Sequence, residues 1–214
     1  MTSRIQLTQI KNQIAASIIL LVLLCSFALP EQAYAKNVSI AFPTLSNFVE
    51  TVKNGNASAL RGVYVSNIMA LTIEQQPVGN PGYVSKTDNV ATQFNSATRV
   101  GNIGLLAHNT HAGSNFSSIK IGDQIVLVFG DGRTETFVVN IIQRFQALDS
   151  QSIYSQFKDL ETQTTYDASK LFNKIYRGDY HLTLQTCIMK SGDANWGRLF
   201  ITATPVEKSI VLSK

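Results

Sequence analysis

Long apolar runs, cysteine and clustered charge are all scarce in this chain of 214 residues, and each scarcity excludes a class of protein. Thirteen glycines and five prolines are too few for a collagen-like or linker-like composition. The sequence is 44% hydrophobic and 15% charged, which excludes a disordered tail and suits one globular domain with a short appendage. Beyond the N-terminus no segment is apolar enough to cross a membrane, so the sequence contains at most one membrane segment.

The charged residues do not form the basic patches that are typical of proteins that bind nucleic acid. The net charge of +4 is spread along the sequence without clusters of one sign. We therefore expect an ordinary solvated surface and no nucleic-acid partner.

The first 35 residues have the pattern of a secretory signal. Arg4 and Lys11 precede a run without charge, residues 14–29, and Ala33-Tyr34-Ala35 then supplies a small-x-small cleavage site. The run has 16 residues, fewer than the roughly 20 that span a bilayer comfortably. We therefore predict a cleaved signal peptide over residues 1–35, with a retained anchor at residues 14–29 as the alternative. Both interpretations place the domain outside the cytoplasm.

Cleavage would remove Cys25 and leave Cys187 as the single thiol. An exported domain with one cysteine forms no internal disulfide. Cys187 is then either a small buried apolar residue or a nucleophile, and its surroundings must decide between the two.

A helical leader is predicted over residues 36–59, ahead of a main domain over residues 60–214. Thr44 can cap a helix whose apolar residues recur at helical spacing as far as Val52, and Asn54-Gly55 then ends it.

The main domain has the short, β-branched apolar runs of a β protein. Gly130-Asp131-Gly132, between two runs, is typical of a hairpin turn because glycine tolerates positive φ. Residues 148–180 interrupt the pattern, and their apolar residues from Leu171 to Tyr176 have helical spacing, which predicts a helix within an insertion. About seven or eight strands indicate an antiparallel barrel or sandwich. The clearest runs are residues 62–65, 69–73, 103–107, 125–129, 137–142, 181–188 and 198–204.

Cys187 lies on one of these predicted strands, in which alternate residues share a face. One face carries Leu182, Leu184 and Thr186, and the other carries Thr183, Gln185 and Cys187. The leucines should take the core, so Cys187 faces away from it. With residues 189–196 as a hairpin loop, we expect Arg198, at the start of the next strand, to lie beside Cys187.

These residue types in this arrangement suit nucleophilic catalysis. A cation beside a thiol favours the reactive thiolate, and the planar guanidinium of Arg198 can also hold a carbonyl oxygen. Nucleophilic catalysis also requires a group that transfers protons. His108 is the best candidate, because it directly follows the run 103–107 and is held by the end of a strand.

Three motifs resemble those of the sortases, which are exported cysteine transpeptidases. They are Gly104-Leu105-Leu106-Ala107-His108-Asn109, Thr183-Leu184-Gln185-Thr186-Cys187 and Gly197-Arg198-Leu199-Phe200, and the resemblance covers about residues 60–206. It implies a mostly β fold, a closed eight-stranded sortase-like β-barrel with short helices, one of them in the insertion before the cysteine strand. Ala107 stands where many members have glycine, and no acidic cluster matches the calcium site of some class A members, so the subfamily stays open.

The resemblance also implies an activity. Cys187 would attack a backbone carbonyl of a sorting peptide, commonly of Leu-Pro-x-Thr-Gly type, with His108 as the acid/base and Arg198 orienting the substrate. Thr183 and Thr186 would contact the substrate. The implied partners are exported proteins that carry a sorting signal and an amine acceptor of the cell wall or of another protein, and no cofactor is needed.

Two alternatives stay open. His108, His111 and Cys187 are metal-ligand types with a His-x-x-His spacing, so an extracellular zinc site is one, although the Arg198 cation argues against it. The other is a noncatalytic envelope-binding module that kept the barrel.

Overall fold

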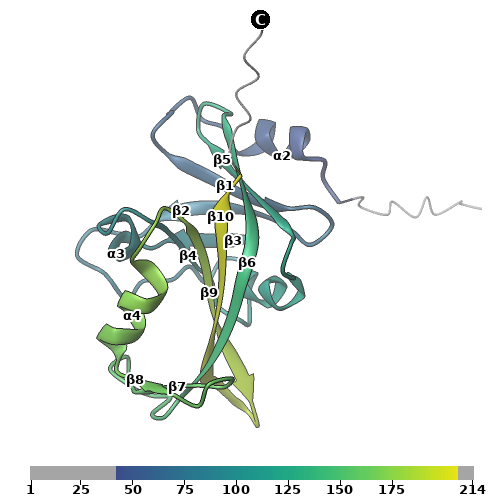
Figure 1. Ribbon diagram of the computed structural model, residues 1–214. Helices are drawn as coiled ribbons and strands as arrows, with labels where there is room; N and C mark the ends of the chain where they lie inside the picture. Colours follow the sequence, from purple (N-terminus) through teal and green to yellow (C-terminus); the bar gives the residue numbers. More distant parts are fainter. Residues whose placement is uncertain (1–41, 207–214) are drawn as a thin grey trace, which may run out of the picture. The chain divides into compact units, whose positions relative to one another are not determined.

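Residues 42–206 are described by a computed structural model of the protein (Figure 1). The predicted signal peptide, the alternative anchor at residues 14–29 and Cys25 lie outside the described residues. The helices are α2 (Leu45–Val52), α3 (Asn95–Thr98), α4 (Ala168–Tyr176) and the 3₁₀ helix η1 (Ala112–Ser118). The strands are β1 (Leu60–Val65), β2 (Met69–Gln75), β3 (Val90–Gln93), β4 (Ile103–Leu106), β5 (Gln124–Phe129), β6 (Thr134–Ala147), β7 (Phe157–Asp159), β8 (Thr165–Tyr166), β9 (Leu182–Lys190) and β10 (Asp193–Pro205). None of the helices between residues 42 and 206 is both long enough and apolar enough to cross a membrane.

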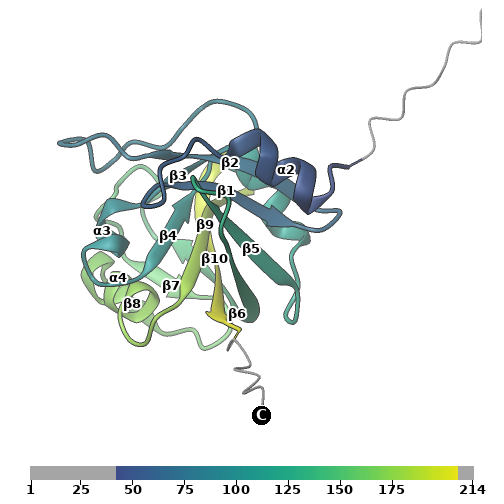
Figure 2. The same ribbon diagram turned by 90° about the horizontal axis from the view of Figure 1, so that it is seen from above.

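Eight of these strands close into a barrel. They follow one another in the order β10-β9-β4-β3-β2-β1-β5-β6, and β6 pairs back with β10 to close the ring (Figure 2). β7 and β8 extend the sheet outward from β6. The closed eight-stranded barrel is therefore confirmed, and the sandwich alternative is wrong.

The expectation of a purely antiparallel sheet is also wrong. β2 pairs parallel with β3, and β4 pairs parallel with β9. A parallel pair needs a long crossover, and the chain supplies one in each case, over residues 76–89 and over the stretch between β4 and β9. The second crossover matters most, because it brings the end of β4 next to the cysteine strand.

The β9 and β10 ladder separates two apolar clusters. Leu182 and Leu184 are buried in the barrel core, as the alternation predicted, and Leu199 and Ile201 of β10 are buried there too. On the opposite face, Phe200 packs with apolar residues of α4 in a second cluster. Asp167 caps α4, its carboxylate accepting the Lys170 backbone N–H at 2.7 Å, and Figure 1 shows this helix beside the barrel. The insertion helix is therefore confirmed, and it covers the outer face of the ladder.

The leader helix is present as predicted. The Thr44 hydroxyl accepts the Asn47 backbone N–H at 3.3 Å, and Phe48 and Val52 are buried against β1 and β5. Gly62 makes this close packing possible, because a Cβ there would lie 2.7 Å from the Phe48 ring.

The loop between the last two strands is much shorter than predicted. β9 continues to Lys190 and β10 begins at Asp193, so residues 189–196 are not a hairpin loop. Ser191 and Gly192 make the turn with φ values of 51° and 82°. The extra residues are absorbed as a bulge between Asp193 and Gly197, where the register with β9 shifts. The hairpin predicted at Gly130-Asp131-Gly132 is confirmed, with Gly132 at φ 87°.

Candidate active site

Cys187 and Arg198 are directly opposite residues in the antiparallel β9–β10 ladder. Directly opposed residues project from the same face of a sheet, with Cβ atoms about 4.5–5.5 Å apart. Both side chains are half-buried, and Cys187 forms no disulfide. Cys187 and Arg198 are thus cross-strand neighbours, as expected, although the loop between their strands is not the one expected.

The Arg198 guanidinium is anchored by its own strand. Nη1 donates to the carbonyl oxygens of Asn195 at 3.1 Å and Gly197 at 2.9 Å. The guanidinium carbon lies 5.7 Å from the centre of the Phe157 ring, within cation–π range. These contacts use one of the two terminal nitrogens, so the planar group is held in place while Nη2 and Nε keep donor capacity for a ligand.

His108 comes from a different part of the chain. β4 ends at Leu106, and the next residue, Ala107, donates its N–H to the Gln185 carbonyl of β9 at 3.1 Å. The His108 carbonyl then accepts the N–H groups of His111 at 3.0 Å and Gly113 at 2.9 Å, which closes a tight turn. The parallel pairing of β4 with β9 therefore carries His108 to the cysteine strand.

Burial lowers the pKa of His108 below its ordinary value of 6.5. Repulsion from His111 and Lys86 acts in the same direction, whereas a hydrogen bond to the Val84 backbone opposes it. The neutral imidazole is therefore favoured near neutral pH, and this is the form that accepts a proton.

One cavity of about 310 Å³ brings the three residues together. His108, Cys187 and Arg198 all line it, with Thr186 beside them and residues 150–153 as a further wall. Because these side chains come from the turn after β4, from β9 and from β10, the site exists only in the closed barrel.

A second cavity of about 290 Å³ adjoins the first, and Leu106, Gln185 and Arg198 line both. Its wall is aromatic and aliphatic, with Phe94, Phe157, Leu171, Phe172, Tyr176 and Phe200. The Tyr176 hydroxyl donates to the Gln185 side-chain oxygen at 2.6 Å, which fastens α4 to β9. Burial raises the pKa of Tyr176, so its hydroxyl stays protonated as this donor. The two cavities together make a groove that leads from the thiol to an apolar pocket.

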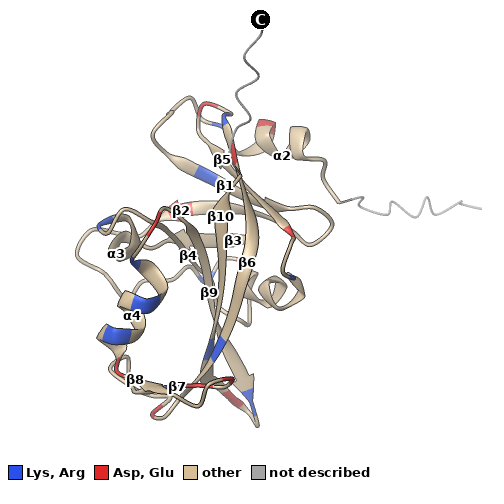
Figure 3. Ribbon diagram, in the orientation of Figure 1, with Lys and Arg blue, Asp and Glu red and all other residues tan. Residues whose placement is uncertain are grey.

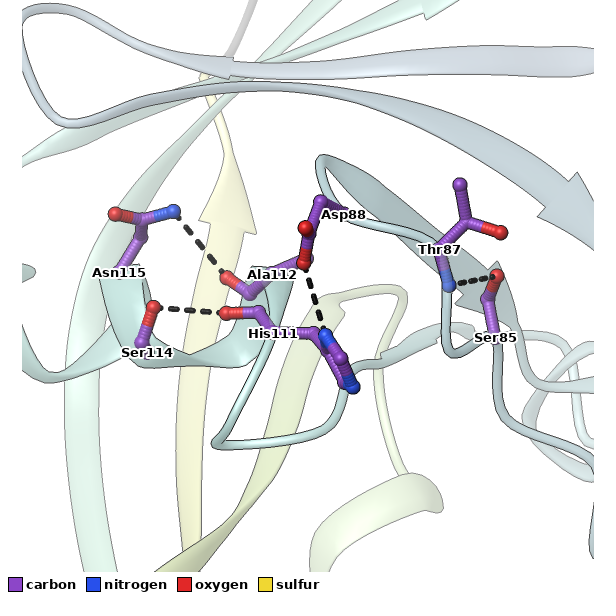
Figure 4. Close-up of polar contacts among 7 residues, drawn as sticks. All are labelled: Ser85, Thr87, Asp88, His111, Ala112, Ser114 and Asn115. Atoms are coloured by element: carbon purple, nitrogen blue, oxygen red, sulfur yellow. Dashed lines mark hydrogen bonds and ion pairs between the residues drawn. The ribbon is translucent and has the colours of Figure 1, made fainter.

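His111 faces away from a shared metal site. Its Nδ1 lies 2.8 Å from Asp88 Oδ1, and Figure 4 shows the ring turned toward this carboxylate from the turn that begins η1. The centres of the His108 and His111 rings are 6.3 Å apart. Within residues 42–206 no three His, Cys, Asp or Glu side chains are grouped closely enough to hold a metal ion. The set of His108, His111 and Cys187 is therefore not assembled as a zinc site.

The chain matches no protein-family model and no curated protein. Among solved structures, sortase C1 from Streptococcus agalactiae matches with a TM-score of 0.45 and 16% identity over 72% of this chain and 69% of that one. A lid mutant of sortase A from Corynebacterium diphtheriae matches with a TM-score of 0.45 and 15% identity over 78% of each chain. Sortase A from Listeria monocytogenes matches with a TM-score of 0.43 and 15% identity, over 70% of this chain and 88% of that one.

These similarities concern the fold alone.

The two threonines of the cysteine motif lie in different surroundings. Thr186 lines the cavity, is 5% exposed, and its hydroxyl has no hydrogen-bond partner among the described residues. Thr183 is completely buried beneath α4, where its hydroxyl contacts the Ile175 carbonyl and the Thr202 hydroxyl, each at 3.5 Å. The structure therefore brings Thr186 to the site and leaves Thr183 in the packing between helix and sheet.

Other residues of the site were not predicted from the sequence. Asp193 accepts a hydrogen bond from Ser150 and the Asn195 backbone N–H, and these bonds, with the Arg198 charge, lower its pKa. Asp193 thereby links the 150–153 wall to the β9–β10 hairpin. Short Ser, Asp and Asn side chains indicate turns in the sequence, but no local pattern predicts which turns contact one another.

Charge is distributed evenly around this framework. Figure 3 shows Lys, Arg, Asp and Glu interspersed over the ribbon, with basic residues in α4. The described residues thus agree with the absence of basic patches in the sequence.

Proposed function

We propose that the protein is a sortase-type cysteine transpeptidase that works outside the cytoplasm. The proposal rests on one observation, namely that Cys187, His108 and Arg198 line the same cavity and that Arg198 is directly opposite Cys187 in the ladder. A thiol, a neutral imidazole and an anchored guanidinium are the groups that acyl transfer through a thioester needs. The signal over residues 1–35, the leader over residues 36–59 and the catalytic domain over residues 60–214 are parts of the same proposal.

Cys187 attacks the scissile carbonyl of a sorting peptide as the thiolate, with its proton held by His108. The carbon–nitrogen bond then breaks, His108 returns the proton to the leaving amine, and the acyl group stays on sulfur as a thioester. An acceptor amine attacks the thioester, gives up a proton to His108 and releases the thiol. Water in place of the amine makes the same site a protease.

Arg198 holds the peptide and the developing oxyanion. Its Nη1 is occupied by the Asn195 and Gly197 carbonyls, so Nε and Nη2 face the substrate with a fixed orientation. The adjoining apolar pocket under α4 suits an apolar side chain of a signal such as Leu-Pro-x-Thr-Gly. The partners are therefore exported proteins with such a signal and an amine of the cell wall or of another protein.

The test is to trap the thioester. The purified full chain is incubated with a panel of sorting-signal peptides, and mass spectrometry then looks for an acyl adduct on Cys187 and for transfer to an added amine. Wild type is expected to form both, and Cys187→Ala neither, with its thermal unfolding unchanged because a half-buried thiol contributes little packing.

A Cys187→Ala variant that still transfers peptide contradicts the proposal. A folded wild type that forms no adduct with any peptide supports the noncatalytic module instead.

A further inference from the structure

The bulge in β10 leaves backbone carbonyls without partners in the ladder. The register with β9 shifts between Asp193 and Gly197, so residues 194–196 are out of step with the facing strand. Carbonyls freed in this way need other donors, and bulges beside functional sites often serve to aim side chains. Here two consecutive carbonyls, those of Ala194 and Asn195, accept hydrogen bonds from side chains.

The donors at these carbonyls belong to the two sides of the site. Arg198 Nη1 donates to the Asn195 carbonyl at 3.1 Å. Asn109 Nδ2 donates to the Ala194 carbonyl at 2.9 Å, across 85 positions of sequence. Asn109 directly follows His108, so the bulge holds the guanidinium with one carbonyl and the histidine turn with the next.

The other hydrogen bonds of the histidine turn do not reach the bulge. The His111 and Gly113 N–H groups bond within the turn, and the His111 side chain reaches Asp88 in the loop before β3 (Figure 4). Among the hydrogen bonds between described residues, the one from Asn109 is the bond that joins the turn to the bulge. Asn109 and Cys187 also line a common cavity of about 410 Å³, so this bond lies close to the thiol.

We propose that Asn109 is a positioning residue, whose amide fixes the distance between His108 and the β10 bulge that carries Arg198. The inference rests on the proposed function and adds a residue to its site. Asn109 touches neither the substrate nor the sulfur in this role. It acts through His108, because without the bond the histidine turn is still held to β9 by the Ala107 N–H but is no longer held to the bulge beside Arg198.

The sharpest test is Asn109→Asp, which keeps the size of the side chain and replaces the donor by an acceptor that cannot bond to a carbonyl. Asn109→Ala removes the donor without adding charge. Asn115 offers a matched control, because it is also half-buried in the same segment and its amide donates, among the described residues, to the nearby Ala112 carbonyl at 3.4 Å. Asn115→Asp and Asn115→Ala therefore repeat the changes in volume and charge without touching the bulge.

Both Asn109 variants are expected to lower kcat about tenfold to a hundredfold, because displacing a catalytic group by about 1 Å has effects of this order. KM should stay within about twofold, since Asn109 does not hold the substrate. The melting temperature should match that of the Asn115 variants, which separates positioning from folding. The Asn115 variants should keep the wild-type kcat.

A second measurement needs no peptide. The rate at which iodoacetamide alkylates Cys187, followed against pH, reports on the thiol and imidazole together. Its pH profile should change in both Asn109 variants and stay that of wild type in both Asn115 variants. Profiles that coincide for Asn109→Asp, Asn109→Ala and wild type overturn the inference, whether or not wild type cleaves peptides.

Failure of the positioning role can be distinguished from failure of the proposed function. An active wild type with Asn109 variants of equal kcat overturns the positioning role and leaves the proposed function intact. An inactive wild type contradicts the proposed function, and the alkylation profiles then decide the role of Asn109 separately.

Discussion

Gly113 is a position where a single added methyl group should disturb the site. A Cβ there would contact the Thr186 hydroxyl and lie 2.7 Å from the Ala107 carbonyl oxygen and 2.8 Å from the His108 carbonyl oxygen. Ordinary contacts of a Cβ begin near 3.4 Å, so the His108 carbonyl must retreat by about 0.6 Å. Both oxygens belong to the backbone, so the retreat moves the histidine itself.

Gly113→Ala is therefore expected to reduce both stability and turnover. Overpacking of this kind costs about 1–3 kcal/mol of unfolding free energy, which lowers the melting temperature by about 3–10 °C for a domain of this size. The movement of His108 should lower kcat about tenfold or more. Thermal unfolding and peptide transfer, measured on the same preparation, check both effects.

Gly62→Ala is the matched control. Its Cβ would lie 2.7 Å from the Phe48 ring and 3.1 Å from Val52, beneath α2 and away from the histidine turn. It should lower the melting temperature by a similar amount and leave kcat unchanged. If Gly113→Ala retains the wild-type kcat and melting temperature, the reasoning about the turn is wrong.

Three further predictions concern the site and its surroundings. Arg198→Lys keeps the charge and loses the planar donors, so kcat should fall about tenfold to a hundredfold. Arg61→Lys serves as the control. Equal activity of Arg198→Lys and wild type would show that the charge at this position is sufficient. Because the pKa of His108 is lowered by folding, the unfolded chain binds more protons, and the unfolding free energy should fall as pH drops below 6.5 toward the lowered value. Denaturant titrations should find this part of the pH dependence missing in His108→Gln, and an identical pH dependence would contradict the assignment. Residues 149–179 can be exchanged for the corresponding segment of a sortase that recognises another sorting signal. This exchange should change the peptide preference and preserve the alkylation of Cys187. An unchanged preference in a folded chimera would mean that other loops, such as residues 75–98, determine specificity.

Local patterns were sufficient for much of the fold. Alternation of residue types predicted that Leu182 and Leu184 enter the core and that Cys187 faces away, since side chains on a strand alternate whatever the strand pairs with. Helical spacing predicted α2, with Thr44 as its capping residue, and it predicted α4 from the apolar residues alone. The proximity of Cys187 and Arg198 could also be predicted from the sequence, because their two strands are consecutive in the chain.

The strands that escaped prediction are short or depend on distant partners. β3, β7 and β8 have four, three and two residues, which is too few for a periodicity to show. β3 is parallel to β2 and exists only because the barrel offers it two neighbours.

The sequence by itself determined which residues are available for chemistry and which face of its strand each one occupies, because these properties follow from residue type and from a period of two. Only the tertiary structure decided which of them meet. The parallel pairing of β4 with β9 brings His108 into the cavity that Cys187 lines, the bulge in β10 exposes the Ala194 carbonyl to Asn109, and α4 buries Thr183 while Thr186 lines the cavity. Each of these contacts joins segments far apart in the chain or depends on how a helix docks, and its free energy comes from closing the barrel as a whole rather than from any local pattern.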